Sequence, residues 1–288
     1  MSDPIYHLDG DLVPASEATV SVDDRGFRYG DGAFETLRAY GGTVFEWEAH
    51  ADRLEATCET LDLEHGLSRA DLHGRIEETL EANGFTDAYV RLSITRGVQP
   101  GKLTPDPAVD PTVVVYVKSL SRGGLEGDPV WDGPATLETV ETRRIPDEAI
   151  PAAAKTHNYL NGILARNELS PDADEALLCD LEGAVAEGAT SNVWFVADGT
   201  VHTPATDGSV LPGITRRVVL EVAAEVDMPV REGRYEPATV REAEEVFLTN
   251  TTWEIRPVTA VDGRQLEVGP VTERLSRAFD ERIERTCY

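Results

Sequence analysis

The sequence predicts an α+β protein divided into two domains. Its 288 residues exceed what one hydrophobic core usually fills, and 41% of them are hydrophobic, which is enough for packed cores. Segments with strand alternation and segments with helical spacing both occur along the chain. Residues 119–134 are rich in glycine and proline and show little periodicity. We therefore expect a small N-terminal domain at 1–120, an interdomain linker at 121–134 and a larger domain at 135–288.

The first elements are predicted from turns and spacing. Residues 6–13 form a hairpin pattern around Asp9-Gly10. A glycine-rich stretch at 23–43 indicates a tightly bent backbone, or an ordinary loop before a hairpin. Apolar positions at helical intervals predict a helix over 47–61 with Arg53 beside the stripe, and Ser68 with Asp71 gives a capping box for a second helix that stops near residue 84.

Two strands should complete the first half. Residues 89–96 alternate, with Tyr89 and Arg91 on the polar face. A phenol and a guanidinium two residues apart are suited to holding a carboxylate, although a solvated strand face explains the pattern equally well. Residues 112–118 form a continuous apolar run, which is typical of a strand buried on both faces.

The second half predicts further strands and helices. Strands are expected at 135–142, 175–179, 193–196, 245–249 and 255–261, and helices at 158–168, from 213 to 226, and from 270 onward. Glycine and threonine at the start of the helix near 213 offer free backbone N–H groups and the positive end of the helix dipole. Such a terminus suits a phosphate, although a Pro-Gly pair is more often only a cap.

Net charge excludes some partners. The formal charge is −27, with 53 acidic and 26 basic residues spread along the chain. This argues against nucleic acid and anionic membranes. An acid-rich composition with three lysines is typical of a halophilic protein in a salt-rich cytoplasm. The three cysteines have no close spacing that indicates a disulfide framework or a zinc site, and the N-terminus lacks a signal pattern, so we expect a soluble cytoplasmic protein.

Lys155 is the strongest candidate for chemistry. The other lysines are Lys102 and Lys118, and Lys155 follows Ile150, a proline and three alanines. Burial among apolar residues lowers the pKa of an amine, and a neutral amine is what Schiff-base chemistry requires. A lysine whose stem covers apolar surface is the plainer alternative. Glu187 stands among small residues, which would let it touch a ligand.

Four segments, in this order, resemble the class IV aminotransferases. They are YGDGAFE at 29–35, RIPDEAIPAAAKTHNY at 144–159, EGATSN at 187–192 and LPGITR at 211–216. These fold-type IV enzymes use pyridoxal 5'-phosphate (PLP) and include branched-chain aminotransferases, D-amino-acid aminotransferases and aminodeoxychorismate lyases. The resemblance implies a small N-terminal α/β domain, a larger C-terminal PLP-binding domain with a β-barrel-like core, and a homodimer whose pocket lies near the subunit interface.

The resemblance also implies roles for individual residues. Lys155 would be the Schiff-base lysine and proton carrier, and Glu187 would pair with the ring nitrogen of PLP. Tyr159 would contact the ring hydroxyl, with Arg144 supporting that side. The phosphate would be held by Arg53, Ile214, Thr215 and Thr251. The substrate side would comprise Tyr29, Phe34, Tyr89, Arg91 and Thr252.

Two positions depart from the branched-chain pattern. Thr156-His157 shorten the segment between Lys155 and Tyr159 by one residue. An acid–base role for His157 is the alternative, but with Lys155 available we interpret it as a packing or surface imidazole. Thr36 stands where branched-chain enzymes have glycine, and it matches the lyase, in which a threonine hydroxyl assists release of pyruvate. Tyr89 with Arg91 favours amino transfer, which is also the commoner activity in the family. We expect transfer between a branched-chain-like amino acid and a 2-oxo acid such as 2-oxoglutarate. The alternatives are 4-amino-4-deoxychorismate lyase activity, which releases pyruvate and 4-aminobenzoate for folate synthesis, and a non-catalytic homologue.

Overall fold

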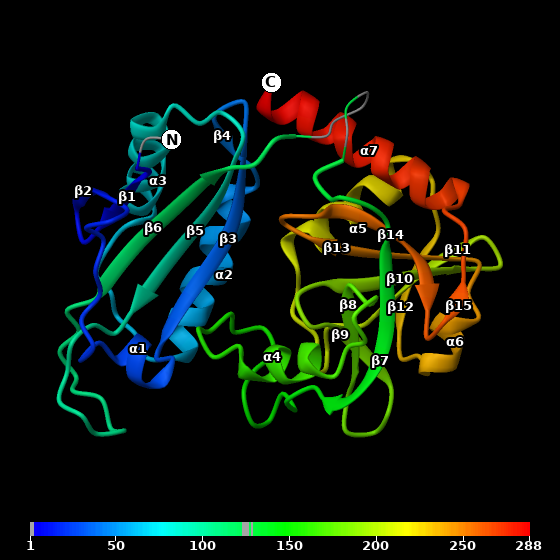
Figure 1. Ribbon diagram of the computed structural model, residues 1–288, viewed down its shortest axis with the longest axis horizontal. Helices are drawn as coiled ribbons and strands as arrows, with labels where there is room; N and C mark the ends of the chain where they lie inside the picture. Colours follow the sequence, from blue (N-terminus) through cyan, green and yellow to red (C-terminus); the bar gives the residue numbers. More distant parts are fainter. Residues whose placement is uncertain (1–2, 123–126, 128) are drawn as a thin grey trace. The chain divides into compact units, whose positions relative to one another are not determined.

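The structure is a computed structural model that describes residues 3–122, 127 and 129–288 (Figure 1). The strands are β1 (Ile5–Leu8), β2 (Asp11–Pro14), β3 (Gly32–Tyr40), β4 (Thr43–Val44), β5 (Ala88–Thr95), β6 (Thr112–Ser119), β7 (Ala135–Arg143), β8 (Glu175–Cys179), β9 (Val185–Gly188), β10 (Asn192–Ala197), β11 (Thr200–Pro204), β12 (Val230–Gly233), β13 (Glu245–Asn250), β14 (Glu254–Val261) and β15 (Arg264–Gln265). The helices are α1 (Arg25–Tyr29), α2 (Trp47–Thr60), α3 (Arg69–Asn83), α4 (Leu160–Asn167), α5 (Ile214–Glu225), α6 (Pro237–Arg241) and α7 (Pro270–Cys287). The predicted α+β class is confirmed. Within the described ranges, no helix has the length and apolar character needed to cross a membrane.

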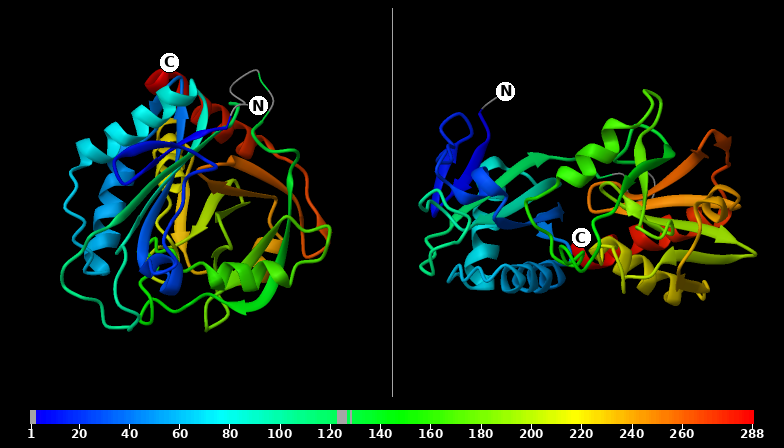
Figure 2. Two further views of the ribbon diagram at one scale, coloured as in Figure 1. Left: turned by 60° about the vertical axis from the view of Figure 1, so that its left-hand side comes forward. Right: turned by 90° about the horizontal axis from the view of Figure 1, so that it is seen from below.

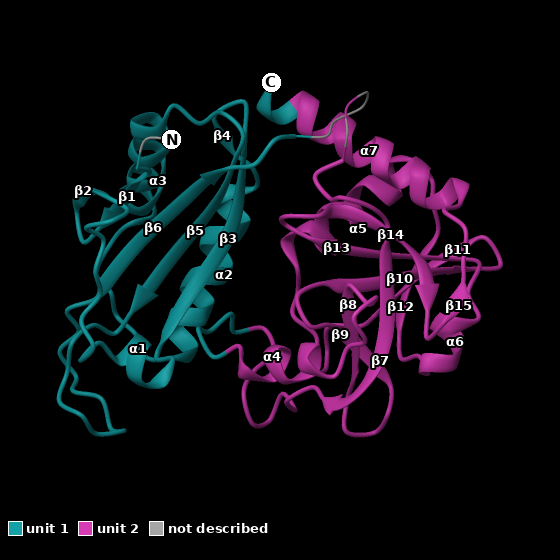
Figure 3. Ribbon diagram, viewed as in Figure 1, with its two compact units in different colours: residues 1–122, 154–158, 286–288 teal, residues 123–153, 159–285 magenta. Residues whose placement is uncertain are grey.

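The chain divides into two compact units (Figure 3). Unit 1 spans residues 1–122, 154–158 and 286–288, and unit 2 spans 123–153 and 159–285. The lysine segment thus belongs to the unit formed mainly by the N-terminal half. The domain boundaries expected from the sequence, at 1–120, 121–134 and 135–288, stay a prediction. Residues 123–126 and 128 of the expected linker lie outside the described residues.

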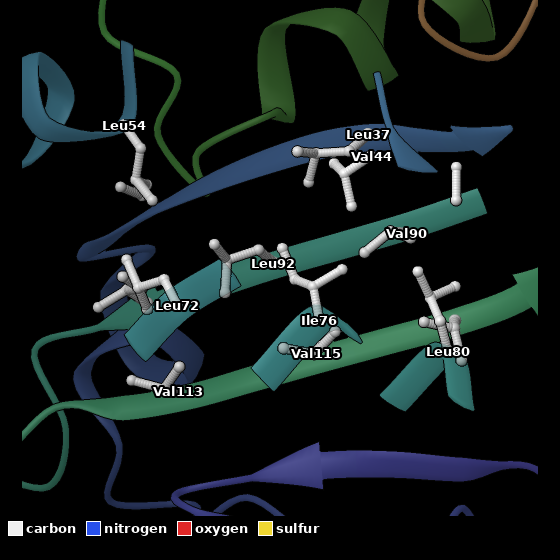
Figure 4. Packing of buried hydrophobic residues seen from close by; sticks show 14 of the residues in the cluster. Leu37, Val44, Leu54, Leu72, Ile76, Leu80, Val90, Leu92, Val113 and Val115 are labelled. Carbon is white, nitrogen blue, oxygen red and sulfur yellow. The ribbon is translucent and has the colours of Figure 1, made fainter. Parts of the chain in front are cut away.

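Unit 1 is built on a sheet that, in the described part of the chain, has six strands in the order β2-β1-β6-β5-β3-β4. Helices α2 and α3 cover one face of this sheet (Figure 2). Leu37, Leu92 and Val115 point from the strands toward Ile76 of α3, and all four side chains are fully buried (Figure 4). Burial of such apolar side chains contributes about 1.5–3 kcal/mol each, so this contact fixes α3 on the sheet.

Strand β6 corrects one expectation. Val113, Val115 and Val117 are buried, whereas Val114 and Tyr116 are partly exposed. The strand is therefore buried on one face and not on both. An antiparallel sheet with helices on one side needs apolar residues at alternate positions only, and the valines on the other face do not change that arrangement.

The glycine-rich stretch forms a short helix and a close strand contact. Asp24 caps α1 by accepting hydrogen bonds from the Gly26 and Phe27 N–H groups, and Gly30 ends the helix at φ 70°. A Cβ at Gly32 would lie 2.7 Å from the Ile94 carbonyl oxygen. Glycine at 32 thus lets β3 approach β5, and the helix was not expected because it is only five residues long.

Unit 2 is built on a sheet of nine strands among the described residues. It curls into a half-barrel, with the path β12-β11-β10-β13-β14-β7-β8-β9 and with β15 paired to β14. Helix α7 lies beside α5, where Arg282 donates to Glu221 at 2.9 Å and to Glu225 at 2.5 Å. The sequence did not predict β4, β9, β11, β12, β15 and α6, because these elements are too short to show a clear period.

A buried ion pair joins α2 to β3 in unit 1. Glu35 is 1% exposed, and it accepts hydrogen bonds from Arg53 Nε at 2.8 Å and Nη2 at 2.6 Å. His50 Nδ1 lies 2.7 Å from Glu35 Oε2. Burial alone would raise the pKa of Glu35, but the charge and hydrogen bonds of Arg53 and the bond from His50 lower it to about 2. Glu35 is therefore ionised in the folded protein, and it holds Arg53 against the sheet.

We predict that Glu35→Gln lowers the free energy of unfolding by about 3 kcal/mol at pH 7. Because the folded pKa of about 2 lies below the usual 4.5, this contribution is fully present above pH 4.5 and is lost as the pH falls toward 2. At pH 3 the difference between wild type and variant should be about half as large. Urea unfolding at both pH values measures it.

The matched control is Glu55→Gln, because Glu55 pairs with Arg69 at the surface. That exchange should change the free energy of unfolding by less than about 1 kcal/mol. An effect of Glu35→Gln that stays constant from pH 7 to pH 3 would contradict the assigned ionisation.

Candidate active site

The segment 154–158 lies along the edge of β3 in unit 1. Phe34 N–H donates to the Lys155 carbonyl oxygen at 3.1 Å, and His157 N–H donates to the Gly32 carbonyl oxygen at 2.9 Å. The pairing is antiparallel. Because directly opposed residues of an antiparallel pair share a face, the Lys155 and His157 side chains lie on the same side of the sheet as Phe34. Backbone pairing thus fixes where the candidate lysine projects.

The Phe34 ring contacts three residues that the sequence singled out, which are Lys155, Arg91 and His157. Its side chain is 4% exposed. The Lys155 side-chain nitrogen lies 4.6 Å from the ring centroid, and the Arg91 guanidinium carbon lies 3.7 Å from it. His157 meets the same ring edge to face, with centroids 5.8 Å apart. The ring attracts cationic groups, so it orders an amine and a guanidinium at one place.

The surroundings of Lys155 differ from the expectation. Ala152 is buried, but Pro151 and Ala153 are exposed and Ile150 is half-buried, so these neighbours in sequence do not together enclose the lysine. Lys155 itself is half-buried. Its side chain contacts Phe34, more than a hundred residues earlier, and sequence neighbours could not reveal this contact.

His157 is a neutral packing residue in the structure. Burial and the nearby Arg91 lower the pKa of its imidazole to about 4, although a hydrogen bond with the Ala33 backbone raises it. Its ring is therefore uncharged at neutral pH and packs against Phe34.

Of the remaining candidate residues of unit 1, Thr36 and Tyr89 share the sheet face of Phe34, whereas Tyr29 does not belong to that sheet. Thr36 is directly opposite Arg91 in the β3–β5 ladder, so it shares the face of Phe34. Tyr89 lies on that face too, where its ring is 5.2 Å from the Lys118 amine. Tyr29 ends α1, is 39% exposed, and stacks under Arg25. Tyr29 is thus held by α1 and not by the β3–β5 face.

Arg53 reaches its site from the helix side of the sheet. The Nε and Nη2 nitrogens both donate to Glu35, and the side chain is 9% exposed. A phosphate bound at Arg53 would therefore share a guanidinium whose charge is already balanced by a buried carboxylate.

Three of the matching segments are joined by Glu187 in unit 2. Arg144 Nε donates to one carboxylate oxygen of Glu187 at 2.6 Å, and the Leu211 N–H donates to the other at 2.9 Å. Asn192 adds a bond from its side chain to the Leu211 carbonyl oxygen at 2.9 Å. Glu187 is 6% exposed. Residues far apart in sequence are thus held around one buried carboxylate.

The N-terminus of α5 adjoins this junction. Its N-cap, Gly213, provides no side-chain hydrogen bond, and Ile214 and Thr215 are buried behind it. A Cβ at Gly213 would overlap the side-chain oxygen of Asn192. Glycine is therefore required for the helix to start beside Asn192, and the first turn presents backbone N–H groups at the positive end of the dipole.

The turn after β13 carries Thr251 and Thr252. Asn250 Oδ1 accepts hydrogen bonds from the Thr252 N–H and hydroxyl, both at 3.0 Å, and from Trp253 N–H at 2.7 Å. Asn250 also donates to the Thr190 carbonyl oxygen at 3.3 Å. The turn is thereby attached to the 187–192 segment.

Tyr159 stands at the N-cap of α4. Asn161 in the first turn of this helix accepts from Arg144 Nη1 at 3.4 Å and donates to the Arg143 carbonyl oxygen at 2.9 Å. Helix α4 is thus tied to the segment that carries Arg144.

Sequence reasoning missed several supporting residues. Glu35, His50 and Thr57 contact or adjoin Arg53, and Asn161 and Asn192 orient Arg144 and Leu211. The signal available for two of them is the spacing of His50, Arg53 and Thr57, which places all three on one side of a helix. Glu35, Asn161 and Asn192 could be found only from pairings distant in sequence.

The family model described as "Amino-transferase class IV" matches residues 32–261. A putative branched-chain-amino-acid aminotransferase of Methanocaldococcus jannaschii is 38% identical, over 96% of this chain and 95% of that protein. D-alanine aminotransferase of Listeria monocytogenes is 36% identical, over 96% of this chain and 95% of that protein.

Solved structures give the same family. The branched-chain aminotransferase of Thermoproteus uzoniensis with norvaline has a TM-score of 0.88 at 30% identity, covering 97% of this chain and 94% of that chain. The 4-amino-4-deoxychorismate lyase of Pseudomonas aeruginosa has a TM-score of 0.81 at 29% identity, covering 98% of this chain and 100% of that chain. The fold is therefore that of the fold-type IV enzymes, and the chain belongs to the class IV aminotransferases.

Proposed function

We propose that this class IV aminotransferase moves an amino group from a branched-chain-like amino acid to a 2-oxo acid such as 2-oxoglutarate, with Lys155 as its catalytic amine. The observation that carries the proposal is the position of Lys155, whose backbone pairs with β3 and whose amine lies 4.6 Å from the Phe34 ring. An amine on a fixed strand can return to one reacting atom repeatedly, which a two-stage transfer requires.

Class IV aminotransferases use PLP, and the residues of this chain fit that group. Glu187 is a buried carboxylate that can face a protonated ring nitrogen, and the α5 N-terminus has no side-chain cap to compete with a phosphate. Lys155, Arg53, Arg144, Tyr159, Glu187, Ile214, Thr215 and Thr251 are the residues that would hold it. When bound, PLP supplies a ring that takes up the electron pair left at the substrate α-carbon.

The side chains divide the remaining work. Lys155 takes the proton from the α-carbon of the substrate and returns it during transfer. The Arg91 guanidinium, with Tyr89 near it, can donate two hydrogen bonds to a substrate carboxylate, and the Phe34 ring lies against the amine. Glu187, fixed by Arg144 and the Leu211 N–H, would pair with the protonated ring nitrogen of the cofactor.

Lyase activity is the second candidate. Thr36 favours it, because its hydroxyl shares the sheet face of Phe34 and Arg91. The similarity to the Pseudomonas aeruginosa lyase is lower in TM-score than that to the Thermoproteus uzoniensis branched-chain enzyme. The relatives include both branched-chain and D-alanine aminotransferases. Whether this enzyme uses the L or the D form of its amino acid is therefore determined by assay.

We predict that Lys155→Ala lowers kcat for transfer from leucine to 2-oxoglutarate by at least about 10³-fold, because the proton carrier is lost. Lys102→Ala is the matched control, since Lys102 is exposed and belongs to the same unit. The control should stay within about twofold of wild type. Product glutamate measures both.

The same assay set separates the rival activities. L-leucine, D-alanine and aminodeoxychorismate are supplied to wild type and to Thr36→Ala. Transfer from D-alanine without transfer from L-leucine would replace the branched-chain assignment. Formation of 4-aminobenzoate that disappears in Thr36→Ala while transfer is absent would establish the lyase instead.

We also propose a homodimer with the pocket near the subunit interface. Leu160, Ile163 and Leu164 are 59%, 55% and 49% exposed on one side of α4, an apolar face that a second copy would cover. Ile163→Asp should convert a dimer into a 31.4 kDa monomer in sedimentation and reduce activity with it. Leu181→Asp, at a 67% exposed leucine in a turn, should leave the dimer intact. A wild-type monomer would contradict the proposal.

A salt-rich cytoplasm is proposed from the charge of −27. Salt shortens the range of repulsion between carboxylates, from about 10 Å at 0.1 M to about 3 Å at 1 M. The thermal midpoint should therefore rise by several degrees between 0.1 M and 2 M KCl, as followed by circular dichroism. An unchanged or lower midpoint would count against salt adaptation.

A further inference from the structure

Thr57 of α2 makes a contact with the lysine segment that the transfer chemistry described above does not use. Its side chain is 1% exposed. The hydroxyl accepts a hydrogen bond from the Lys155 backbone N–H at 3.0 Å and donates its own proton to the Arg53 carbonyl oxygen at 2.8 Å. A hydroxyl has one proton and two lone pairs, so both bonds form at once.

The contact completes a clamp on the Lys155 backbone. On the β3 side, the Lys155 carbonyl oxygen accepts from Phe34 N–H at 3.1 Å. On the α2 side, the Lys155 N–H donates to Thr57. Pairing with β3 therefore holds one end of this residue and Thr57 holds the other. Together they fix the backbone from which the catalytic side chain projects.

The same helix face carries the phosphate candidate. His50, Arg53 and Thr57 follow at intervals of three and four residues, and Glu35 holds the first two against β3. Donation from Thr57 to the Arg53 carbonyl oxygen makes the hydroxyl oxygen a better acceptor for Lys155. Movement of α2 relative to the lysine segment is thus resisted at one hydroxyl.

We propose that Thr57 is a positioning residue, whose hydroxyl sets the placement of Lys155 relative to the Phe34 ring and couples it to the helix that bears Arg53. This inference rests on the proposed role of Lys155. Without the hydroxyl, the Lys155 N–H loses this hydrogen bond and the clamp keeps only its β3 side. Displacement of a catalytic group by about 1 Å can cost 10²-fold in rate.

A purely structural role makes a different prediction, and α3 supplies the matched control. Thr79 is 0% exposed, and its hydroxyl donates to the Arg75 carbonyl oxygen at 2.5 Å, in the same spacing as Thr57 to Arg53. Both helices pack on the same sheet face. Thr79→Val therefore removes an equivalent helix bond without touching Lys155.

The experiment compares Thr57→Val, Thr57→Ser and Thr79→Val with wild type in the full-length protein. Four quantities are measured: the thermal midpoint, the amide hydrogen exchange of the peptide that contains Lys155, the Kd for added PLP, and kcat for transfer. Exchange reports the backbone clamp without any turnover. If valine at 57 gives no folded protein, Thr57→Ala removes the same hydroxyl with a smaller side chain.

Thr57→Val should raise the Kd for PLP about tenfold, lower kcat about tenfold or more, and speed exchange at Lys155 at least tenfold. Thr57→Ser should stay within about threefold of wild type in all these quantities. Thr79→Val should lower the thermal midpoint and leave exchange at Lys155, the Kd for PLP and kcat unchanged. The proposal would be overturned if Thr57→Val had the same exchange rate and the same Kd as wild type. It would also be overturned if Thr79→Val changed exchange, Kd and kcat as much as Thr57→Val does. If wild type itself carries no PLP on Lys155, the proposed function fails instead, which is a separate result.

Discussion

The antiparallel pairing between β3 and residues 154–158 is the constraint on which the account depends. It brings Lys155 to Phe34, although more than a hundred residues separate them in sequence. The pairing also decides which face of the sheet the amine reaches, because side chains alternate along a strand. A shift of one residue would turn Lys155 toward the other face, away from Arg91. The Thr57 contact matters for the same reason, since it opposes such a shift.

Unit 2 holds the buried side chain of Glu187 in one orientation. The Arg144 guanidinium donates to one carboxylate oxygen and the Leu211 N–H donates to the other. The helix start at Gly213 depends on the same junction through Asn192. A carboxylate with fixed donors and a helix N-terminus beside it suits a ligand that is cationic at one end and anionic at the other.

The sequence predicted elements whose cause is local. The capping box at Ser68 and the alternation through Leu92 need only neighbouring residues, and both are present in the structure. The one-sided burial of β6, the short helix α1 and the partner of Lys155 depend on which elements pack together. Apolar runs cannot show how many faces of a strand are covered, and flanking alanines cannot show that the amine contacts a ring from another part of the chain. The order of the four motifs predicted the family, and the match of the family model to residues 32–261 confirms it.

The most direct test of the central claim uses the fact that the chain has three lysines. Wild-type protein is mixed with PLP, reduced with borohydride, digested and mapped by mass spectrometry. We expect a phosphopyridoxyl group on Lys155, with Lys102 and Lys118 unmodified at stoichiometric PLP. Equal labelling of the three lysines, or no label on Lys155, would contradict the assignment of its amine as the catalytic group.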